Sequence, residues 1–232
     1  EIKQNEGRVA LLPADAAELV ALGHTVYFET NCGLLAGFEN QEYVAAGAIE
    51  LAHHHEIFQK ATLILKIKEY MPEEFEYIRP DHILCGFFHL TGDKHETDVL
   101  LAKGATAIDY EYFKNPKTGR RTITMSPIAG RLGVMIGFNY MLSINGGRGI
   151  MPMGVPGVEG AHVTILGTGD VGMGAIKTAI GLGAKVTVMS PELRELEQLE
   201  NHFGSQVVYK VSNRGNILES LKTCDAIINC VY

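Results

Sequence analysis

The sequence predicts an α/β protein with two Rossmann-like lobes, each built on a parallel sheet. In both halves of the chain, short apolar runs alternate with helix-like segments of about 10–15 residues. Such crossovers join parallel strands and cover both faces of a sheet. A polar stretch at 115–121, which contains Pro116 and Gly119, separates the halves. We therefore expect one domain at 1–121 and a second at 122–232.

The composition is that of a folded, acidic protein. Hydrophobic residues make up 46% of the 232 residues and charged residues 20%, which argues against disorder. Nucleic acids and anionic membranes attract proteins with an excess of positive charge, whereas the net charge of this chain is -7. We therefore expect neither as a partner. Apolar runs are shorter than the roughly 20 residues that a membrane-spanning helix needs. The four cysteines form no C-x-x-C pair, which favours reduced thiols and a cytoplasmic location.

The first half alternates helices and strands. Pro13 starts a helix that Gly23 ends, the usual asymmetry of these two residue types. Asp93 and Glu96 have the spacing of a capping box, which opens a helix ending at Gly104. Apolar runs and stop signals predict the remaining elements, which are a strand at 25–28, helices at 41–46 and 55–61, and strands at 62–68, 83–88 and 105–109.

A long helix opens the second half. Ser126 and Pro127 form a strong start signal, and we expect the helix, 127–143, to connect the two lobes. It is predicted to bury one largely apolar face. The residues of that face are Ile128, Leu132, Met135, Ile136, Asn139 and Tyr140. Glycine- and proline-rich segments at 145–149 and 152–160 then predict a flexible connection.

A second alternation of strands and helices follows this connection. It consists of strands at 162–166, 185–189, 206–209 and 226–230, separated by helices at 171–182, 191–202 and 216–222. The chain stops inside its last apolar run, where a helix or loop normally follows. We therefore expect the second domain to be truncated at Tyr232 and a C-terminal segment to complete the first.

The strand at 162–166 leads directly into a glycine fingerprint. Its pattern is G-x-G-x-x-G, and the residues assigned to cofactor binding are Gly167, Gly169, Asp170, Val171 and Gly172. The first glycine permits a tight turn, the second lets a pyrophosphate approach the backbone, and the third lets helix and strand pack closely. The helix N-terminus favours an anion. A glycine-rich turn without a ligand is the alternative, but the context predicts a dinucleotide-binding domain.

The end of the second strand in this lobe bears on the choice between NAD and NADP. An acid about 20 residues beyond the fingerprint usually binds the adenosine ribose hydroxyls, and this sequence has Ser190 there. Serine tolerates a 2′-phosphate, and Arg194 lies one helical turn further on to pair with it. Glu192 is a second candidate for the hydroxyls. Alternatively, Ser190 caps the helix that starts at Pro191. We expect NAD, with NADP open.

Ionisable residues end two strands of the first half. Lys66 and Lys68 have a spacing of two at the end of the strand at 62–68, which predicts that both lie on one face. His89 follows the strand at 83–88. Ligands bind beyond the carboxyl ends of parallel strands. A strand-end lysine, which is a fixed cation, and His89, whose residue type titrates near neutrality, would therefore share one crevice. Solvated lysines and a packing histidine are the alternative.

Two further groups of residues are candidate ligands. Arg8, in a polar stretch, offers a bidentate clamp for a substrate carboxylate, although a surface arginine looks the same. The run His53, His54 and His55 suggests a metal, but consecutive side chains diverge, so we expect no metal site. No paired carboxylates or Ser/His/Asp arrangement supports hydrolase chemistry.

These segments together resemble alanine dehydrogenase and its relatives, which include the N-terminal part of transhydrogenase alpha chains and the saccharopine dehydrogenases. The resemblance covers nearly the whole chain. The matching segments are 5–11, 65–69, 88–90, 125–126, 129–131, 154–158, the glycine fingerprint and 181–184.

The resemblance implies an oxidoreductase that catalyses the reversible oxidative deamination of L-alanine to pyruvate and ammonia with a nicotinamide cofactor. It implies that Arg8 and Lys68 hold the substrate carboxylate and carbonyl oxygen, and that His89 donates and accepts the proton. The domain at 1–121 is then the substrate domain, and Ser126 matches a residue near the cofactor. The family also implies a homo-oligomer.

Two alternative functions stay open within this resemblance. One is a reductive condensing enzyme of the saccharopine or carboxyethyl-ornithine type, which joins an amino acid to an oxo acid. The other is the nucleotide-binding module of a transhydrogenase, whose chains lack the residues that match His89 and Lys68.

Overall fold

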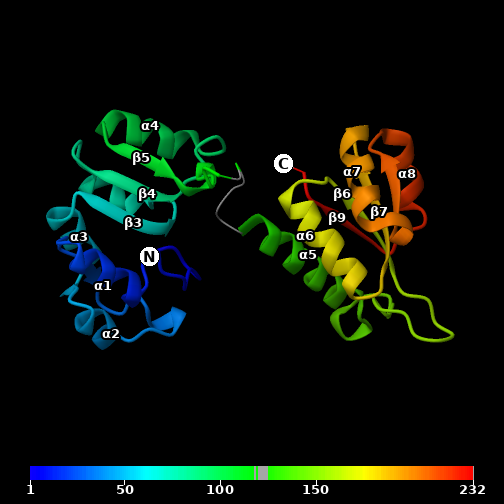
Figure 1. The fold of residues 1–232 in the computed structure, drawn as a ribbon, viewed down its shortest axis with the longest axis horizontal. Helices are drawn as coiled ribbons and strands as arrows, with labels where there is room; N and C mark the ends of the chain where they lie inside the picture. Colours follow the sequence, from blue (N-terminus) through cyan, green and yellow to red (C-terminus); the bar gives the residue numbers. More distant parts are fainter. Residues whose placement is uncertain (118, 120–124, 232) are drawn as a thin grey trace. The chain divides into compact units, whose positions relative to one another are not determined.

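The computed structural model describes residues 1–117, 119 and 125–231, which form two compact units, Glu1–Ile123 and Thr124–Tyr232 (Figure 1). In both units, all pairings between the described strands are parallel, and helices or turns separate the strands along the chain. The predicted α/β class with parallel sheets is therefore confirmed. The predicted boundary between 121 and 122 and part of the predicted loop at 115–121 lie outside the described residues.

The first unit holds a two-stranded sheet, β1–β2, and a three-stranded sheet, β3–β4–β5. Two apolar clusters form its core, one around Phe28 and Tyr43 and one around Phe58, Leu84 and Phe88. Its elements are α1 (Pro13–Ala21), β1 (Tyr27–Glu29), α2 (Asn40–Ala45), β2 (Ile49–Leu51), α3 (His54–Lys60), β3 (Leu63–Lys68), η2 (Pro72–Tyr77), β4 (Ile83–Phe87), α4 (Lys94–Lys103), β5 (Thr106–Asp109) and η3 (Tyr110–Tyr112), with a further short turn, η1 (Leu34–Ala36).

The predicted helices and strands of this unit occur within two residues of their expected bounds. Strand β2 was not predicted, because three residues are too few to show an alternation. The predicted capping box is only half formed. Asp93 accepts a hydrogen bond from the Glu96 N–H at 3.0 Å, but the Glu96 carboxylate accepts one from the Tyr70 N–H instead.

A β-bulge changes the end of β3. Leu65 pairs with Cys85, but Lys68 pairs with Phe87, so β3 has one residue more than β4 over this stretch. A bulge re-aims side chains and interrupts the alternation of a strand. The expectation that Lys66 and Lys68 share one face is wrong for this reason: Lys66 is buried and Lys68 is only half-buried.

The second unit is one sheet with the strand order β8–β7–β6–β9. Its first strand, β6, lies between its second and its fourth, as in the first half of a dinucleotide-binding fold. The elements are α5 (Met125–Met141), η4 (Ser143–Asn145), β6 (His162–Leu166), α6 (Asp170–Gly181), β7 (Lys185–Ser190), α7 (Leu193–Phe203), η5 (Gly204–Gln206), β8 (Val207–Val211), α8 (Arg214–Leu221) and β9 (Ala226–Asn229). The strands β7 and β8 lie on one side of β6, and the last strand, β9, lies on its other side. The carboxyl ends of β6 and β9 therefore flank the topological switch point, at which such folds bind ligands.

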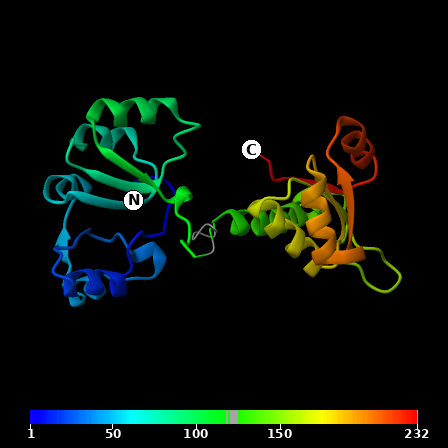
Figure 2. The ribbon, with the colours of Figure 1, turned by 45° about the horizontal axis from the view of Figure 1, so that its top comes forward.

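Helix α5 packs on α6 with a face that was not predicted, and the two helices lie side by side in both views (Figures 1 and 2). Its buried residues are Gly130, Val134, Phe138 and Met141, whereas all six residues of the predicted face are exposed. A Cβ atom on Gly130 would lie 1.9 Å from the Val171 carbonyl oxygen. The helices approach so closely that small residues make the contact, and a search for large apolar side chains misses such a face.

Among the described residues, none of the helices combines the length and the apolar character that spanning a bilayer requires.

Candidate functional site

The glycine turn between β6 and α6 has the geometry that its sequence predicts. Gly167 has φ +99°, a left-handed conformation that favours glycine, and a Cβ atom on Gly172 would lie 2.1 Å from the Gly167 carbonyl oxygen. Among the described residues, apart from its own chain neighbours, nothing lies within 4 Å of the position of a Cβ atom on Gly169. Gly169 and Asp170 are exposed, so a ligand can reach this backbone.

The first turn of α6 presents backbone N–H groups at this open position. Met173 donates the first hydrogen bond of the helix, to the Gly169 carbonyl at 2.8 Å, so Asp170, Val171 and Gly172 precede it. N–H groups at these positions have no partner within a helix and attract anions. The residues present therefore fit the pyrophosphate of a dinucleotide.

Ser126 lies in the first described turn of α5 and is half-buried. The start of α5 is close to α6, because a Cβ atom on Gly174 would lie 2.3 Å from the carbonyl oxygen of Pro127. Ser126 therefore belongs to the same unit as the glycine turn and lies near the helix that follows it.

Ser190 ends β7 and is buried, with only 1% of its surface exposed. Its hydroxyl donates to Glu195 Oε2 at 2.7 Å and accepts from the Glu192 N–H at 3.3 Å. Helix α7 begins at Leu193 and its N-cap residue is Glu192, so the interpretation of Ser190 as the cap of a helix starting at Pro191 is wrong.

Glu195, in the first turn of α7, was not singled out in the sequence. Its Oε2 atom also accepts a hydrogen bond from the hydroxyl of Thr168, the residue between the first two glycines of the fingerprint. The hydrogen bonds from Thr168 and Ser190 lower the pKa of the Glu195 carboxyl below its usual range. The sequence rule looks for an acid at the end of the second strand, which is the position of Ser190. Glu195 lies five residues further on, in a helix, so the rule does not find it.

Arg194, its neighbour, is exposed and forms no ion pair within the described part of the chain. The 2′-phosphate partner suggested by the sequence is therefore not held in place by other side chains.

In the first unit, Lys68 and His89 come from neighbouring strands. Lys68 is the last residue of β3 and is registered with Phe87 at the end of β4, two residues before His89. His89 has φ 55°, which is unusual for a residue other than glycine. Its Nδ1 atom lies 3.1 Å from Oε1 of Glu111 in η3, a partner that the sequence did not indicate.

Arg8 forms a two-pronged ion pair with Glu6. Its Nε and Nη2 atoms donate to the two Glu6 carboxylate oxygens at 2.8 and 2.6 Å. The Arg8 hydrogen bond, with smaller contributions from the charges of Arg8 and Lys68, lowers the pKa of Glu6 to about 2. The two-pronged contact thus commits one edge of the guanidinium to Glu6.

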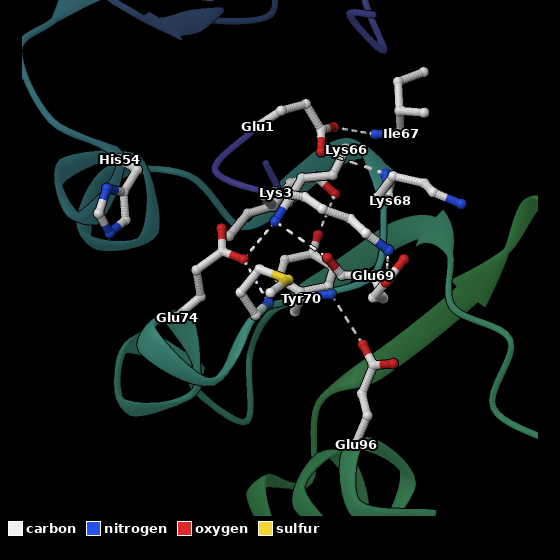
Figure 3. A network of polar contacts seen from close by, with 12 residues as sticks. Glu1, Lys3, His54, Lys66, Ile67, Lys68, Glu69, Tyr70, Glu74 and Glu96 are labelled. Carbon is white, nitrogen blue, oxygen red and sulfur yellow. Dashed lines mark hydrogen bonds and ion pairs between the residues drawn. The ribbon is translucent and has the colours of Figure 1, made fainter. Parts of the chain in front are cut away.

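Lys66 belongs to a buried network rather than to the strand-end group (Figure 3). Its ammonium forms an ion pair with Glu74, donates to the Glu69 carbonyl at 3.3 Å and lies 4.8 Å from the centre of the Tyr70 ring. Figure 3 shows the Lys68 side chain extending away from this pair. Of the two lysines, Lys68 is therefore the one available to a ligand.

Glu96 contacts the same network from α4. Glu96 is 2% exposed, and its Oε1 accepts a hydrogen bond from the Tyr70 N–H at 3.0 Å. Burial raises the pKa of Glu96 to about 7.

The three consecutive histidines lie at the start of α3, where His53 is the N-cap residue. His53 stacks on His55, and His54 and His55 contact the ring of Tyr77. Across residues 1–117, 119 and 125–231, no three His, Cys, Asp or Glu side chains are grouped as a metal site would require.

Two family models match the chain. "Alanine dehydrogenase/PNT, N-terminal domain" covers residues 1–131, and "Alanine dehydrogenase/PNT, C-terminal domain" covers residues 133–232.

Curated relatives match along the whole chain. An alanine dehydrogenase of Methanococcus maripaludis is 42% identical over 232 residues, and one of Bacillus subtilis is 40% identical over 231 residues. The alignments cover 100% of this chain but only 62% and 61% of those proteins.

Solved structures show the same relation. A structure named L-alanine dehydrogenase superimposes with a TM-score of 0.87 at 39% identity and covers 100% of this chain and 64% of that one. A transhydrogenase from Sinorhizobium meliloti superimposes with a TM-score of 0.75 at 23% identity, over 99% of this chain and 67% of that one, which is a likeness of fold.

Proposed function

The chain belongs to the alanine dehydrogenase/PNT family, and from this membership we propose that the protein is an NAD-dependent oxidoreductase that converts L-alanine reversibly to pyruvate and ammonia. The observation that carries the proposal is the 37–42% identity to proteins named alanine dehydrogenase along the whole chain. The likeness to a transhydrogenase, at 23% identity, is one of fold. The condensing enzyme raised by the sequence has no comparable support.

The proposed cofactor site is the glycine turn of the second unit. Gly167, Gly169 and Gly172, with the N–H groups of Asp170 and Val171, would hold the pyrophosphate. Ser126, near the start of α6, is proposed to lie close to the bound cofactor. Ser190, where an acid is usual, keeps NADP as an alternative cofactor, with Arg194 as the partner of its 2′-phosphate. When bound, the cofactor accepts a hydride from the α-carbon of the substrate.

The proposed substrate site consists of Arg8, Lys68 and His89 in the first unit. Arg8 would bind the substrate carboxylate, and the Lys68 ammonium would stabilise the oxygen that becomes the carbonyl. His89 would take a proton from the substrate ammonium and release it to solvent, and would then take a proton from the water that attacks the iminium and give it to the departing amino group. Its Nε2 atom would do this, because Nδ1 faces Glu111.

The test is formation of the reduced cofactor by the protein with L-alanine and NAD, followed by absorbance, together with the reverse reaction from pyruvate and ammonium. We expect both reactions in the absence of any partner subunit. Replacement of His89 by Ala should abolish turnover without changing the dissociation constant for NADH. His95→Ala is the matched control, because His95 is an exposed histidine on α4.

Two outcomes would contradict the proposal. Wild-type turnover in His89→Ala would reject the role of this histidine. If the protein binds NADH and does not oxidise L-alanine, but acts on another pair of amine and oxo acid, it is a condensing enzyme and not an alanine dehydrogenase.

A homo-oligomer in the cytoplasm is part of the same proposal. It is supported by family membership and by the four unbridged thiols. If light scattering gives the mass of a single chain, the protein is not an oligomer.

A further inference from the structure

One carboxylate joins the glycine turn to the end of the next strand. Glu195 Oε2 accepts the hydroxyl hydrogen of Thr168, from the turn after β6, and that of Ser190, from the end of β7. Both donors go to the same oxygen. Within the described part of the chain no donor contacts Oε1, and Glu195 is exposed, so this second oxygen can accept hydrogen bonds from a ligand.

The place of this carboxylate is that of the adenosine ribose in dinucleotide-binding folds. The strands β6 and β7 run in register to Leu166 and Met189, and the Gly167 N–H donates to the Met189 carbonyl at 2.9 Å. Thr168 therefore lies just beyond the carboxyl end of β6, and Ser190 is the last residue of the adjacent parallel strand β7. An acid at this edge ordinarily accepts the ribose hydroxyls.

The charge of Glu195 also bears on the choice of nucleotide. The two hydrogen bonds keep the pKa of the carboxyl low, so it is ionised at neutral pH. An ionised carboxylate accepts hydrogen bonds from the 2′- and 3′-hydroxyls of NAD and repels the 2′-phosphate of NADP. Arg194 would attract that phosphate, but it must be ordered first, whereas Glu195 is already held by two hydroxyls.

We propose that Glu195 is the residue that binds the adenosine ribose, in place of an acid at the end of β7, and that it selects NAD over NADP. The proposal rests on the nucleotide-binding function proposed above. Ser190, in this arrangement, orients the carboxylate instead of contacting the ribose. Thr168 does the same from the glycine turn.

The experiment is isothermal titration of the protein with NADH and with NADPH, which measures binding without turnover. The wild type is expected to bind NADH more tightly. Glu195→Gln keeps an oxygen for Thr168 and Ser190 but loses the charge. We expect it to weaken NADH binding roughly 10- to 100-fold, with no such loss for NADPH, so that the preference collapses.

Three further variants make the test specific. Glu197→Gln removes an exposed acid of the same segment and should leave both dissociation constants unchanged. Glu192→Gln tests the second candidate that the sequence raised, and the preference for NADH is expected to persist in it. Ser190→Asp in the Glu195→Gln background places an acid at the end of β7 and should restore the preference for NADH.

The possible failures are distinguishable. If the wild type binds neither nucleotide, the proposed function fails. If it binds NADH but Glu195→Gln leaves the ratio of the two dissociation constants unchanged, the assignment of Glu195 alone fails. Loss of the preference in Glu192→Gln instead would transfer the role to Glu192.

Discussion

The Nδ1 atom of His89, just beyond β4, lies 3.1 Å from the Oε1 atom of Glu111, in the turn that follows β5. β4 and β5 are adjacent strands, so the fold brings a carboxylate to the imidazole. His89 has φ 55°, and a residue other than glycine stays there only when its surroundings hold it. The contact with Glu111 is one part of those surroundings, and it commits Nδ1, so Nε2 is the nitrogen proposed to carry the proton.

Replacement of Glu111 by Ala should therefore reduce turnover. Without the carboxylate the ring loses its orientation and its preferred tautomer, and we expect kcat to fall about 10- to 100-fold. The dissociation constant for NADH should not change, because Glu111 belongs to the first unit. Steady-state kinetics and titration of NADH measure the two effects. Glu73→Ala removes an exposed acid of the same unit and serves as the control; unchanged kcat in Glu111→Ala would contradict the assignment.

Glu96 should make the stability of the protein depend on pH. Burial raises its pKa in the folded protein from the ordinary 4.5 to about 7, so the folded state prefers the protonated carboxyl. Stability from this group is complete below the pKa of the unfolded chain and is lost as the pH rises to about 7. Glu96→Gln mimics the protonated form and should gain roughly 2–3 kcal/mol over the wild type between pH 4.5 and pH 8. Urea unfolding at several pH values measures this, and a constant difference would contradict it.

The buried ion pair of Lys66 and Glu74 predicts an asymmetric response to mutation. Lys66→Met leaves the carboxylate of the buried Glu74 with the Met71 N–H, at 2.8 Å, as its one remaining hydrogen-bond partner among the described residues. We expect a loss of about 3–5 kcal/mol in the free energy of unfolding. The double variant Lys66→Met/Glu74→Gln removes both charges and should recover most of it. Equal losses in the single and double variants would show that the lysine matters for packing alone.

Two glycines of the second unit should respond oppositely to alanine. A Cβ atom on Gly130 would lie 1.9 Å from the Val171 carbonyl, so Gly130→Ala should force α5 away from α6 and cost about 3 kcal/mol. In the described part of the chain, nothing outside the helix's own backbone lies within 4 Å of a Cβ atom on Gly181, at the end of α6, so Gly181→Ala should be neutral or stabilise by up to about 1 kcal/mol. Thermal unfolding compares them; equal stability of the two variants would contradict the close approach of the helices.

Much of the fold was predictable because its signals are local. Apolar periodicity and glycine or proline stops placed the helices and strands within two residues, and the glycine fingerprint predicted the turn after β6. Strand ends also predicted that Lys68 and His89 come from adjacent strands. The roles of Arg8, Lys68, His89 and Ser126 stay predictions.

The partners of these residues were not predictable, because they are distant in the chain. Glu111 reaches His89 only through the pairing of β4 with β5, and Glu195 reaches Thr168 only through the pairing of β6 with β7. The bulge in β3, which separates Lys66 from Lys68, depends on how two strands align and leaves no mark in the pattern of either.

The amino-acid sequence by itself determined the class of fold, the order of its elements and the turn at Gly167, since these depend on backbone preferences and side-chain periodicity over a few residues. Tertiary structure alone decided that Lys66 is buried with Glu74, that the glycine-containing face of α5 is covered and that Glu195 bonds to Thr168. The physical reason is that a buried charge or polar group must find a partner in three dimensions, and which partner it finds depends on how the strands and helices are brought together.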